Sequence, residues 1–135
     1  MGKMKQKNVE KSVVAIVGIG ALGTVAAELL TRAGVGKLIL IDRDVIEESN
    51  LQRQVLFTEK DIGKPKAKVA EEKLKEINSK IKIKSYALHL NSENISLLKK
   101  TDLILDCTDN LKTRFLLNDF CRKEQIPWIY ASAIR

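Results

Sequence analysis

The fold of this chain is decided by VVAIVGIGALG, residues 13–23. The stretch starts with five consecutive apolar residues, which are typical of a strand buried on both faces. Gly18, Gly20 and Gly23 then form a G-x-G-x-x-G pattern, and helical spacing begins at Ala21. Glycines at such a turn let the backbone approach a phosphate, and the helix N-terminus offers free N–H groups and partial positive charge. The stretch predicts a strand–turn–helix unit that binds a nucleotide; the alternative is that the glycines only permit close helix–strand packing.

Strand and helix patterns alternate along the rest of the chain. Apolar runs predict four more strands, at residues 37–41, 81–88, 103–105 and 128–131. Helical spacing predicts helices at residues 21–32, 66–78 and 111–123, with a short one at 92–98. The inward positions are expected to be Leu22, Ala26, Leu29 and Leu30 in the first helix and Phe115, Leu116 and Phe120 in the last. This order predicts an α/β fold, a Rossmann-like open parallel sheet with helices on both faces.

Composition narrows the possible functions. The chain has 135 residues, enough for one domain, and a net charge of +7 that we interpret mainly as solvated lysine. Aromatic residues make up only 4%, so no specific nucleic-acid binding is expected. No apolar run approaches the length of a membrane span, and Cys107 and Cys121 form no CxxC, so we expect a cytoplasmic protein. Residues 1–11, MGKMKQKNVEK, are interpreted as a loose basic tail preceding a single domain at 12–135.

A long polar connection follows the second predicted strand. Asp42 ends that strand nineteen residues beyond Gly23, where an acid can accept hydrogen bonds from ribose hydroxyls. Residues 42–61 then form a link far longer than the usual 2–6 residues or so, which indicates function. It carries Asp44, Ser49, Asn50, Arg53 and Gln54, and residues 55–57 are expected to pin it to the domain. Arg53 and, beyond Pro65, Lys66 would suit the phosphates of ATP, whereas an NAD site does not need them; alone, each is equally a surface charge.

The fourth predicted strand ends in Asp106-Cys107-Thr108-Asp109-Asn110. The carboxyl ends of parallel strands are where ligands bind in open α/β sheets, so Asp109 is a candidate ligand for Mg²⁺. Asn110 could serve as the N-cap of the next helix, and capping is also the alternative for Asp109. Cys107 is interpreted as a small buried residue, and His89, the single histidine, as a surface residue or one whose hydrogen bonds are satisfied.

Together these stretches resemble the ThiF/MoeB/HesA family, relatives of ubiquitin-activating E1 enzymes. The similar segments are VAIVGIGALG, AGVGKLILIDRDVIEESNLQRQ, GKPKAKVA, DLILDCTDN with Arg114, and the closing SAIR. The resemblance implies a ThiF/E1-like ATP-binding domain that uses ATP and Mg²⁺ to adenylate the carboxyl-terminal glycine of a ubiquitin-fold sulfur carrier, releasing pyrophosphate. It implies that Asn50, Arg53 and Lys66 contact the phosphates, that Asp42 takes the ribose and that Asp109 binds Mg²⁺. The remaining positions implied to line the nucleotide are Gly18, Gly20, Ala21, Gly23, Ser49, Leu51, Gln52 and Asn110.

The chain also departs from the family pattern. Ala21 stands where the family often has a second adjacent glycine, and residues 1–11 lack the arginine that reaches into a partner subunit. The C-terminal half of the family is absent together with its CxxC pairs, so no zinc is expected in this chain. The resemblance implies a homodimer. Three other functions stay open at this point: a nucleotide- or carrier-binding relative without turnover and, with less support, an NAD-dependent oxidoreductase or a basic nucleic-acid binder.

Overall fold

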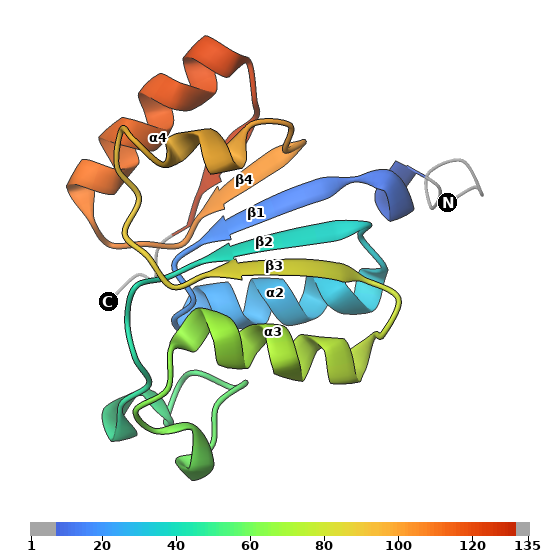
Figure 1. Cartoon of the computed structure of the whole chain (residues 1–135), viewed down its shortest axis with the longest axis vertical. Coiled ribbons are helices and arrows are strands. Elements are labelled where there is room, and N and C mark those ends of the chain that lie inside the picture. Colours follow the sequence, from blue (N-terminus) through green and yellow to red (C-terminus); the bar gives the residue numbers. More distant parts are fainter. Residues whose placement is uncertain (1–7, 132–135) are drawn as a thin grey trace.

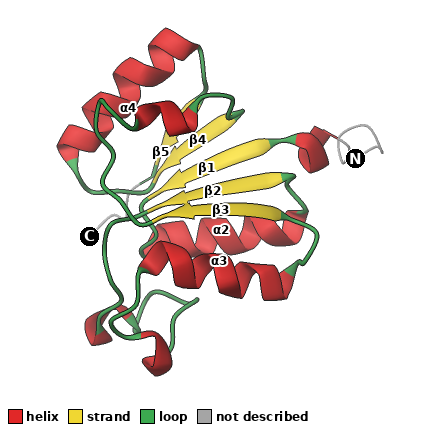
Figure 2. Ribbon diagram, in the orientation of Figure 1, coloured by secondary structure: helices red, strands yellow, loops and turns green. Residues whose placement is uncertain are grey.

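A computed structural model describes residues 8–131 of the chain and shows a five-stranded sheet, all of whose strand pairs are parallel, with the order β3-β2-β1-β4-β5 (Figures 1 and 2). The strands are β1 (Val13–Val17), β2 (Lys37–Ile41), β3 (Lys82–Tyr86), β4 (Leu103–Asp106) and β5 (Trp128–Tyr130). The helices are α2 (Ala21–Ala33), α3 (Lys66–Ile77) and α4 (Leu111–Glu124). Three short 3₁₀ helices are η1 (Glu48–Asn50), η2 (Glu59–Asp61) and η3 (Ile95–Leu98). The Rossmann-like α/β fold predicted from the sequence is confirmed.

Two apolar clusters lie on opposite faces of the sheet. Neighbouring residues of a strand point to opposite faces, so Ile16 belongs to the cluster that includes residues of α2 and α3, while Ala15 belongs to the cluster that includes residues of α4. Both side chains are fully buried. This double coverage explains why β1 and β2 are continuous apolar runs rather than alternating ones.

Two of the positions expected to face inward lie on the surface: Leu29 and Phe115 are 63% and 61% exposed. The others agree better with the prediction, since Phe120 is buried, Ala26, Leu30 and Leu116 pack against the apolar clusters, and Leu22 is half-buried. The buried residues are Gly23, Thr24, Ala27 and Thr31 in α2, and Thr113, Leu117, Phe120 and Cys121 in α4. The glycine turn holds α2 so close to the sheet that small side chains fill the contact, and the larger leucine lies outside.

Two segments also differ from their predicted form. Only residues 95–98 of the short helix expected at 92–98 are helical, as a 3₁₀ helix, and β3 ends at Tyr86 rather than at residue 88. Of the residues expected to pin the β2–α3 connection, Leu56 and Phe57 are buried, but Val55 is 62% exposed.

The described part of the N-terminal segment is attached to the domain. Residues 8–11 are helical, and the Val9 carbonyl accepts hydrogen bonds from the backbone N–H groups of Ser12 and Gly36. The rest of the expected basic tail and the SAIR segment, residues 132–135, lie outside the described residues. No helix within residues 8–131 has the length and apolar character that crossing a membrane requires.

The strand register brings three loops together at the carboxyl edge of the sheet. Val17 of β1 pairs with Ile41 of β2 and with Asp106 of β4, so all three strands end level. The Gly18 N–H donates to the Ile41 carbonyl at 2.8 Å, and the Cys107 N–H donates to the Val17 carbonyl at 2.8 Å. The glycine loop, the β2–α3 connection and the β4–α4 loop therefore leave the sheet side by side.

Candidate functional site

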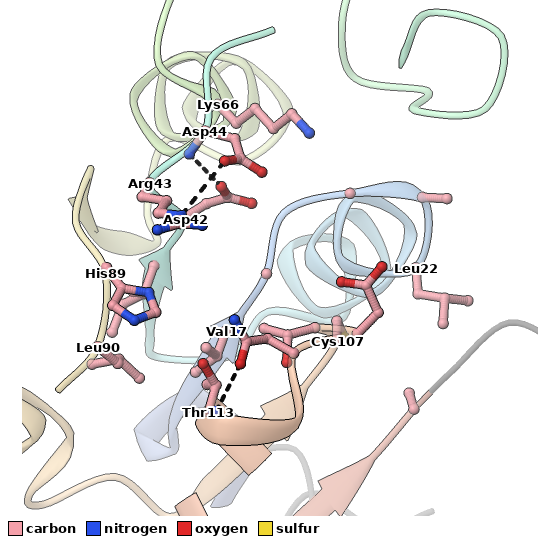
Figure 3. A pocket seen from close by; sticks show the side chains of 18 of the residues that line it. Val17, Leu22, Asp42, Arg43, Asp44, Lys66, His89, Leu90, Cys107 and Thr113 are labelled. Atoms are coloured by element: carbon pink, nitrogen blue, oxygen red, sulfur yellow. Dashed lines mark hydrogen bonds and ion pairs between the residues drawn. The ribbon is translucent and has the colours of Figure 1, made fainter. Parts of the chain in front are cut away.

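A cavity of about 820 Å³ lies where these three loops meet (Figure 3). Nine of the predicted site residues line it: Gly18, Gly20, Ala21, Asp42, Asn50, Arg53, Lys66, Asp109 and Asn110. The other four do not: Gly23 is buried beneath the glycine loop, Leu51 packs against the core, and Ser49 and Gln52 are exposed. The structure thus gathers into one site residues that are more than ninety positions apart in sequence.

The three glycines of the loop meet different constraints. Gly18 has φ +96°, and a Cβ added there would lie 2.9 Å from the Cys107 carbonyl. A Cβ at Gly23 would collide with the Gly18 carbonyl oxygen. At Gly20 the nearest atom to an added Cβ is Nε2 of Gln54, at an ordinary 3.7 Å. Close packing therefore explains Gly18 and Gly23, whereas Gly20 leaves room on the cavity side.

Asp42 is held rigidly at the mouth of the cavity. Its Oδ2 accepts a hydrogen bond from the Ile19 N–H at 2.7 Å, and its Oδ1 accepts one from the Asp44 N–H at 2.7 Å. Burial raises the pKa of Asp42, while these two hydrogen bonds and the nearby Lys66 ammonium oppose the rise. A carboxylate oxygen can accept more than one hydrogen bond, so this carboxylate can still accept from ligand hydroxyls.

The walls beyond Asp42 offer mainly hydrogen-bond donors. Lys66, the first residue of α3, is only 7% exposed, yet its side chain makes no hydrogen bond or ion pair within residues 8–131. Arg53 on the β2–α3 connection is equally unpaired among those residues. Oδ1 of Asn50 accepts from the Glu47 N–H at 2.8 Å, which leaves its Nδ2 for a ligand. Such a set of donors, with a mostly buried lysine that has no ion pair among the described residues, suits an anion such as a phosphate.

The β4–α4 loop forms the opposite wall. Oδ1 of Asn110 accepts from the Thr113 N–H at 3.1 Å, so the N-cap interpretation is confirmed, and its Nδ2 stays available to the cavity. Asp109 is exposed, and its carboxylate has no partner in the described part of the chain. The buried Asp106 shapes the loop by accepting from the Thr108 N–H and hydroxyl at 3.0 and 2.6 Å. Nε of Arg114 lies 3.8 Å from Oδ2 of Asp106, and its Cζ lies 3.4 Å from the centroid of the Tyr130 ring. These contacts support the β4–α4 loop.

Neither cysteine is set up as a nucleophile. Burial, reinforced for Cys107 by the Asp106 carboxylate, raises the pKa of each thiol to about 11. A thiol with such a pKa is almost entirely protonated at neutral pH, and the thiolate is the reactive form. The pKa agrees with the expectation that Cys107 is not a nucleophile, but the residue is half-buried and lines the cavity rather than being buried.

Several cavity residues were missed by sequence reasoning. His89 is exposed but lines the cavity beside Leu90 (Figure 3), and Leu88, Arg43 and Tyr130 also line it. All of them follow the ends of β2, β3 or β5 or stand at such an end. The rule that ligands bind at the carboxyl ends of parallel strands could have identified them if the order of strands in the sheet had been known.

Known proteins share both this sequence and this fold. The chain is 43% identical over 137 residues to the sulfur carrier protein ThiS adenylyltransferase of Bacillus subtilis, covering 99% of this chain and 41% of that protein. It is 46% identical over 123 residues to the adenylyltransferase and sulfurtransferase MOCS3 of Danio rerio, covering 90% of this chain and 27% of that protein. The chain therefore spans less than half the length of these two relatives.

Two solved structures from E. coli extend the comparison. MccB with ATP has a TM-score of 0.89 at 32% identity, with 96% of this chain and 40% of that chain covered. The tRNA N6-threonylcarbamoyladenosine dehydratase TcdA with ATP has a TM-score of 0.90 at 27% identity, with 96% and 54% covered. The ThiF family matches residues 1–135, the whole of the sequence, and this chain belongs to the ThiF family.

Proposed function

We propose that this chain is the ATP-binding part of an adenylyltransferase that activates the carboxyl-terminal glycine of a ubiquitin-fold sulfur-carrier protein and releases pyrophosphate. The observation that carries the proposal is Lys66, a residue only 7% exposed at the cavity wall whose side chain has no hydrogen bond or ion pair within residues 8–131, although the Asp42 carboxylate is near it. Holding a mostly buried lysine without a direct ion pair costs folding free energy, and an anionic ligand would offset that cost. The names of the relatives, sulfur carrier adenylyltransferases, support the same reaction.

The proposed reaction needs positioning more than a protein nucleophile. A carboxylate oxygen of the carrier attacks the α-phosphorus of ATP, a new P–O bond gives the acyl adenylate, and the bond to pyrophosphate breaks. Asp42 would hold the ribose hydroxyls, and Gly20 would let the phosphates approach the backbone. Asn50, Arg53 and Lys66 would donate to phosphate oxygens, whose charge grows as pyrophosphate leaves.

Mg²⁺ fits the carboxylate that the cavity offers. No group of three or more His, Cys, Asp or Glu within residues 8–131 is arranged to hold a metal. Magnesium usually needs only one or two carboxylates, because substrate phosphates and water complete its shell. Asp109, exposed at the cavity and without a partner among the described residues, would hold the ion. When bound, the ion would neutralise phosphate charge.

We also propose a cytoplasmic homodimer, as the family resemblance implies. Sedimentation would then give a mass twice the 15.2 kDa of the chain. A mass of 15.2 kDa at micromolar concentration would contradict the dimer.

Carrier-dependent ATP–pyrophosphate exchange tests the reaction. We expect the wild-type chain to exchange label only when a carrier with a free carboxyl-terminal glycine is added. Lys66→Met should lower the exchange rate by about a hundredfold, because the variant lacks a cation that stabilises the negative charge of the transition state. Lys80→Met, at an exposed position outside the cavity lining, is the matched control and should exchange like wild type.

Two results would contradict the proposal in different ways. ATP binding without exchange would leave a nucleotide-binding relative and remove the enzymatic claim. Tight binding of NAD(H) that is unchanged by Arg53→Ala would contradict the phosphate-binding roles assigned to residues of the β2–α3 connection.

A further inference from the structure

Gln54 is the least exposed polar residue of the β2–α3 connection, at 4%. Its position is fixed by a helical turn, since its backbone N–H donates to the Asn50 carbonyl at 3.0 Å and its carbonyl accepts from the Phe57 N–H at 3.1 Å. The buried side chains of Leu56 and Phe57 anchor the next residues to the core. The backbone therefore points this glutamine inward, although Arg53 beside it is exposed.

The Gln54 amide is aimed at the glycine loop. Its Nε2 is the atom nearest to the position that a Cβ would take on Gly20, at 3.7 Å, and both residues line the cavity. Its Oε1 is buried and has no hydrogen-bond partner among the described residues. The amide thus lies between the loop that carries Arg53 and the glycine that leaves room for a ligand.

An unpaired buried amide oxygen is unusual in this connection. The other two buried polar side chains are paired: Asn50 accepts from the Glu47 N–H, and Asp61 contacts both Thr58 and Lys73. Burying an amide without partners destabilises a fold, and a methionine of similar shape would avoid that loss. The Gln54 Nε2 also has no hydrogen-bond partner among the described residues, and because it lies on the Gly20 side of the cavity it can donate to a ligand there.

We propose that Gln54 is a phosphate-binding residue whose Nε2 donates a hydrogen bond to the nucleotide phosphate that lies over Gly20. This inference rests on the proposed ATP site. The chemistry follows from the neighbours, because Arg53 and Lys66 line the same cavity and favour an anion next to the amide. Gln54 then distinguishes nucleotides that carry phosphates from nucleosides that do not.

Gln54→Met tests the assignment in the 135-residue chain. Calorimetric titration with ATP should show a dissociation constant raised about ten- to a hundredfold, as for one lost hydrogen bond to a charged group. The dissociation constant for adenosine should change less than about twofold, since adenosine has no phosphate. The melting temperature without nucleotide should stay level or rise by about 3 °C, because the unpaired amide is gone.

Gln125→Met is the matched control, since Gln125 is exposed at the end of α4 and lies outside the cavity lining. It should bind ATP and adenosine like wild type. Gln54→Glu, which keeps the length of the side chain but sets a negative charge against the phosphate, should weaken ATP binding more than Gln54→Met does and again spare adenosine. This second variant keeps the test valid if the methionine variant fails to fold.

Three outcomes would overturn the assignment. Unchanged ATP affinity in both variants would show that Gln54 does not bind the phosphate. An equal loss of ATP and adenosine with a lower melting temperature would make Gln54 a packing residue. Failure of the wild-type chain itself to bind ATP would overturn the proposed function and, with it, this inference.

Discussion

Gly20 and Gly23 lie three residues apart in one loop but are needed for different reasons. Gly23→Ala should destabilise the fold by at least about 3 kcal/mol, because the added methyl collides with the Gly18 carbonyl oxygen and backbone cannot move aside cheaply. Gly20→Ala should cost less than about 1 kcal/mol, since its methyl meets only Nε2 of Gln54 at contact distance. Urea denaturation of both variants would measure these differences in the free energy of unfolding.

Nucleotide titration of the same pair completes the prediction. The methyl of Gly20→Ala occupies the space through which a phosphate would approach the backbone, so the dissociation constant for ATP should rise at least about tenfold. If Gly20→Ala bound ATP normally, or if it unfolded like Gly23→Ala, the division of roles between the two glycines would be wrong.

The raised pKa of Asp42 predicts how nucleotide binding responds to acid. Burial favours the neutral carboxyl group, so the free protein takes up this proton at a pH above the ordinary value of 3.8. A protonated Asp42 accepts hydrogen bonds from ribose poorly. ATP affinity should therefore fall as the pH drops through the raised pKa, starting above the pH at which an ordinary aspartate titrates. Titration of ATP binding against pH would show this, and a flat affinity down to pH 3.8 would contradict it.

At the scale of elements, backbone hydrogen bonds join the two ends of the β2–α3 connection. The Ile46 N–H donates to the Lys64 carbonyl, and the Gly63 N–H donates to the Ile46 carbonyl, both at 2.8 Å. On its far side, Asp61 of η2 forms a 2.7 Å ion pair with Lys73 of α3 and accepts from the Thr58 N–H at 2.9 Å. Because these contacts hold the long connection at both places, Arg53 and Gln54 can keep fixed positions. Hydrogen-bond donors to a phosphate need such fixed positions.

Asp61→Asn should loosen that connection. Although burial alone would raise the pKa of Asp61, the contacts with Lys73 and Thr58 outweigh it and lower the pKa below 3.8. A lowered pKa contributes stability that is present above pH 3.8 and is lost as the pH falls through the lowered value. Asp61→Asn should therefore cost about 1–3 kcal/mol at pH 7, and the difference from wild type should shrink in acid. Denaturation curves at several pH values would show whether the two proteins converge; parallel curves would refute this origin of the stability.

The strands were predicted well from the sequence because glycine and aspartate mark the ends of their apolar runs, as at β1 and β2. The exposure of Leu29 was not predictable, because both faces of α2 carry apolar residues and the packing of Gly23 selects the buried one. In the site, the glycine loop, Asp42 and the Asp109 loop follow strand ends that the sequence marks. The places of His89 and Tyr130 depend on which strands are neighbours, which one sequence does not state.

At the scale of the whole molecule, the positive charge is arranged like a solvated surface. Lys82 and Lys84 lie exposed on β3, an edge strand, while Ile83 and Ser85 between and beside them are buried. Lysines on an edge strand discourage pairing with other chains, so these charges need no nucleic acid to explain them. Arg53 and Lys66, which have no ion pair in the described chain, lie instead at the carboxyl edge of the sheet, around the cavity.

Amide hydrogen exchange of the protein, measured with and without ATP, tests this arrangement of the whole molecule. The strand order places residues 18–20, 48–54 and 106–110 around one cavity, although the chain separates them widely. Because a ligand that binds only the folded site suppresses opening of every segment it contacts, ATP should slow exchange in all three segments together. β3, which lies outside the cavity lining, is the internal reference and should change little. Protection confined to one segment would show that the loops do not form a common site, and equal protection by NAD(H) at the same concentration would show that the site does not select ATP.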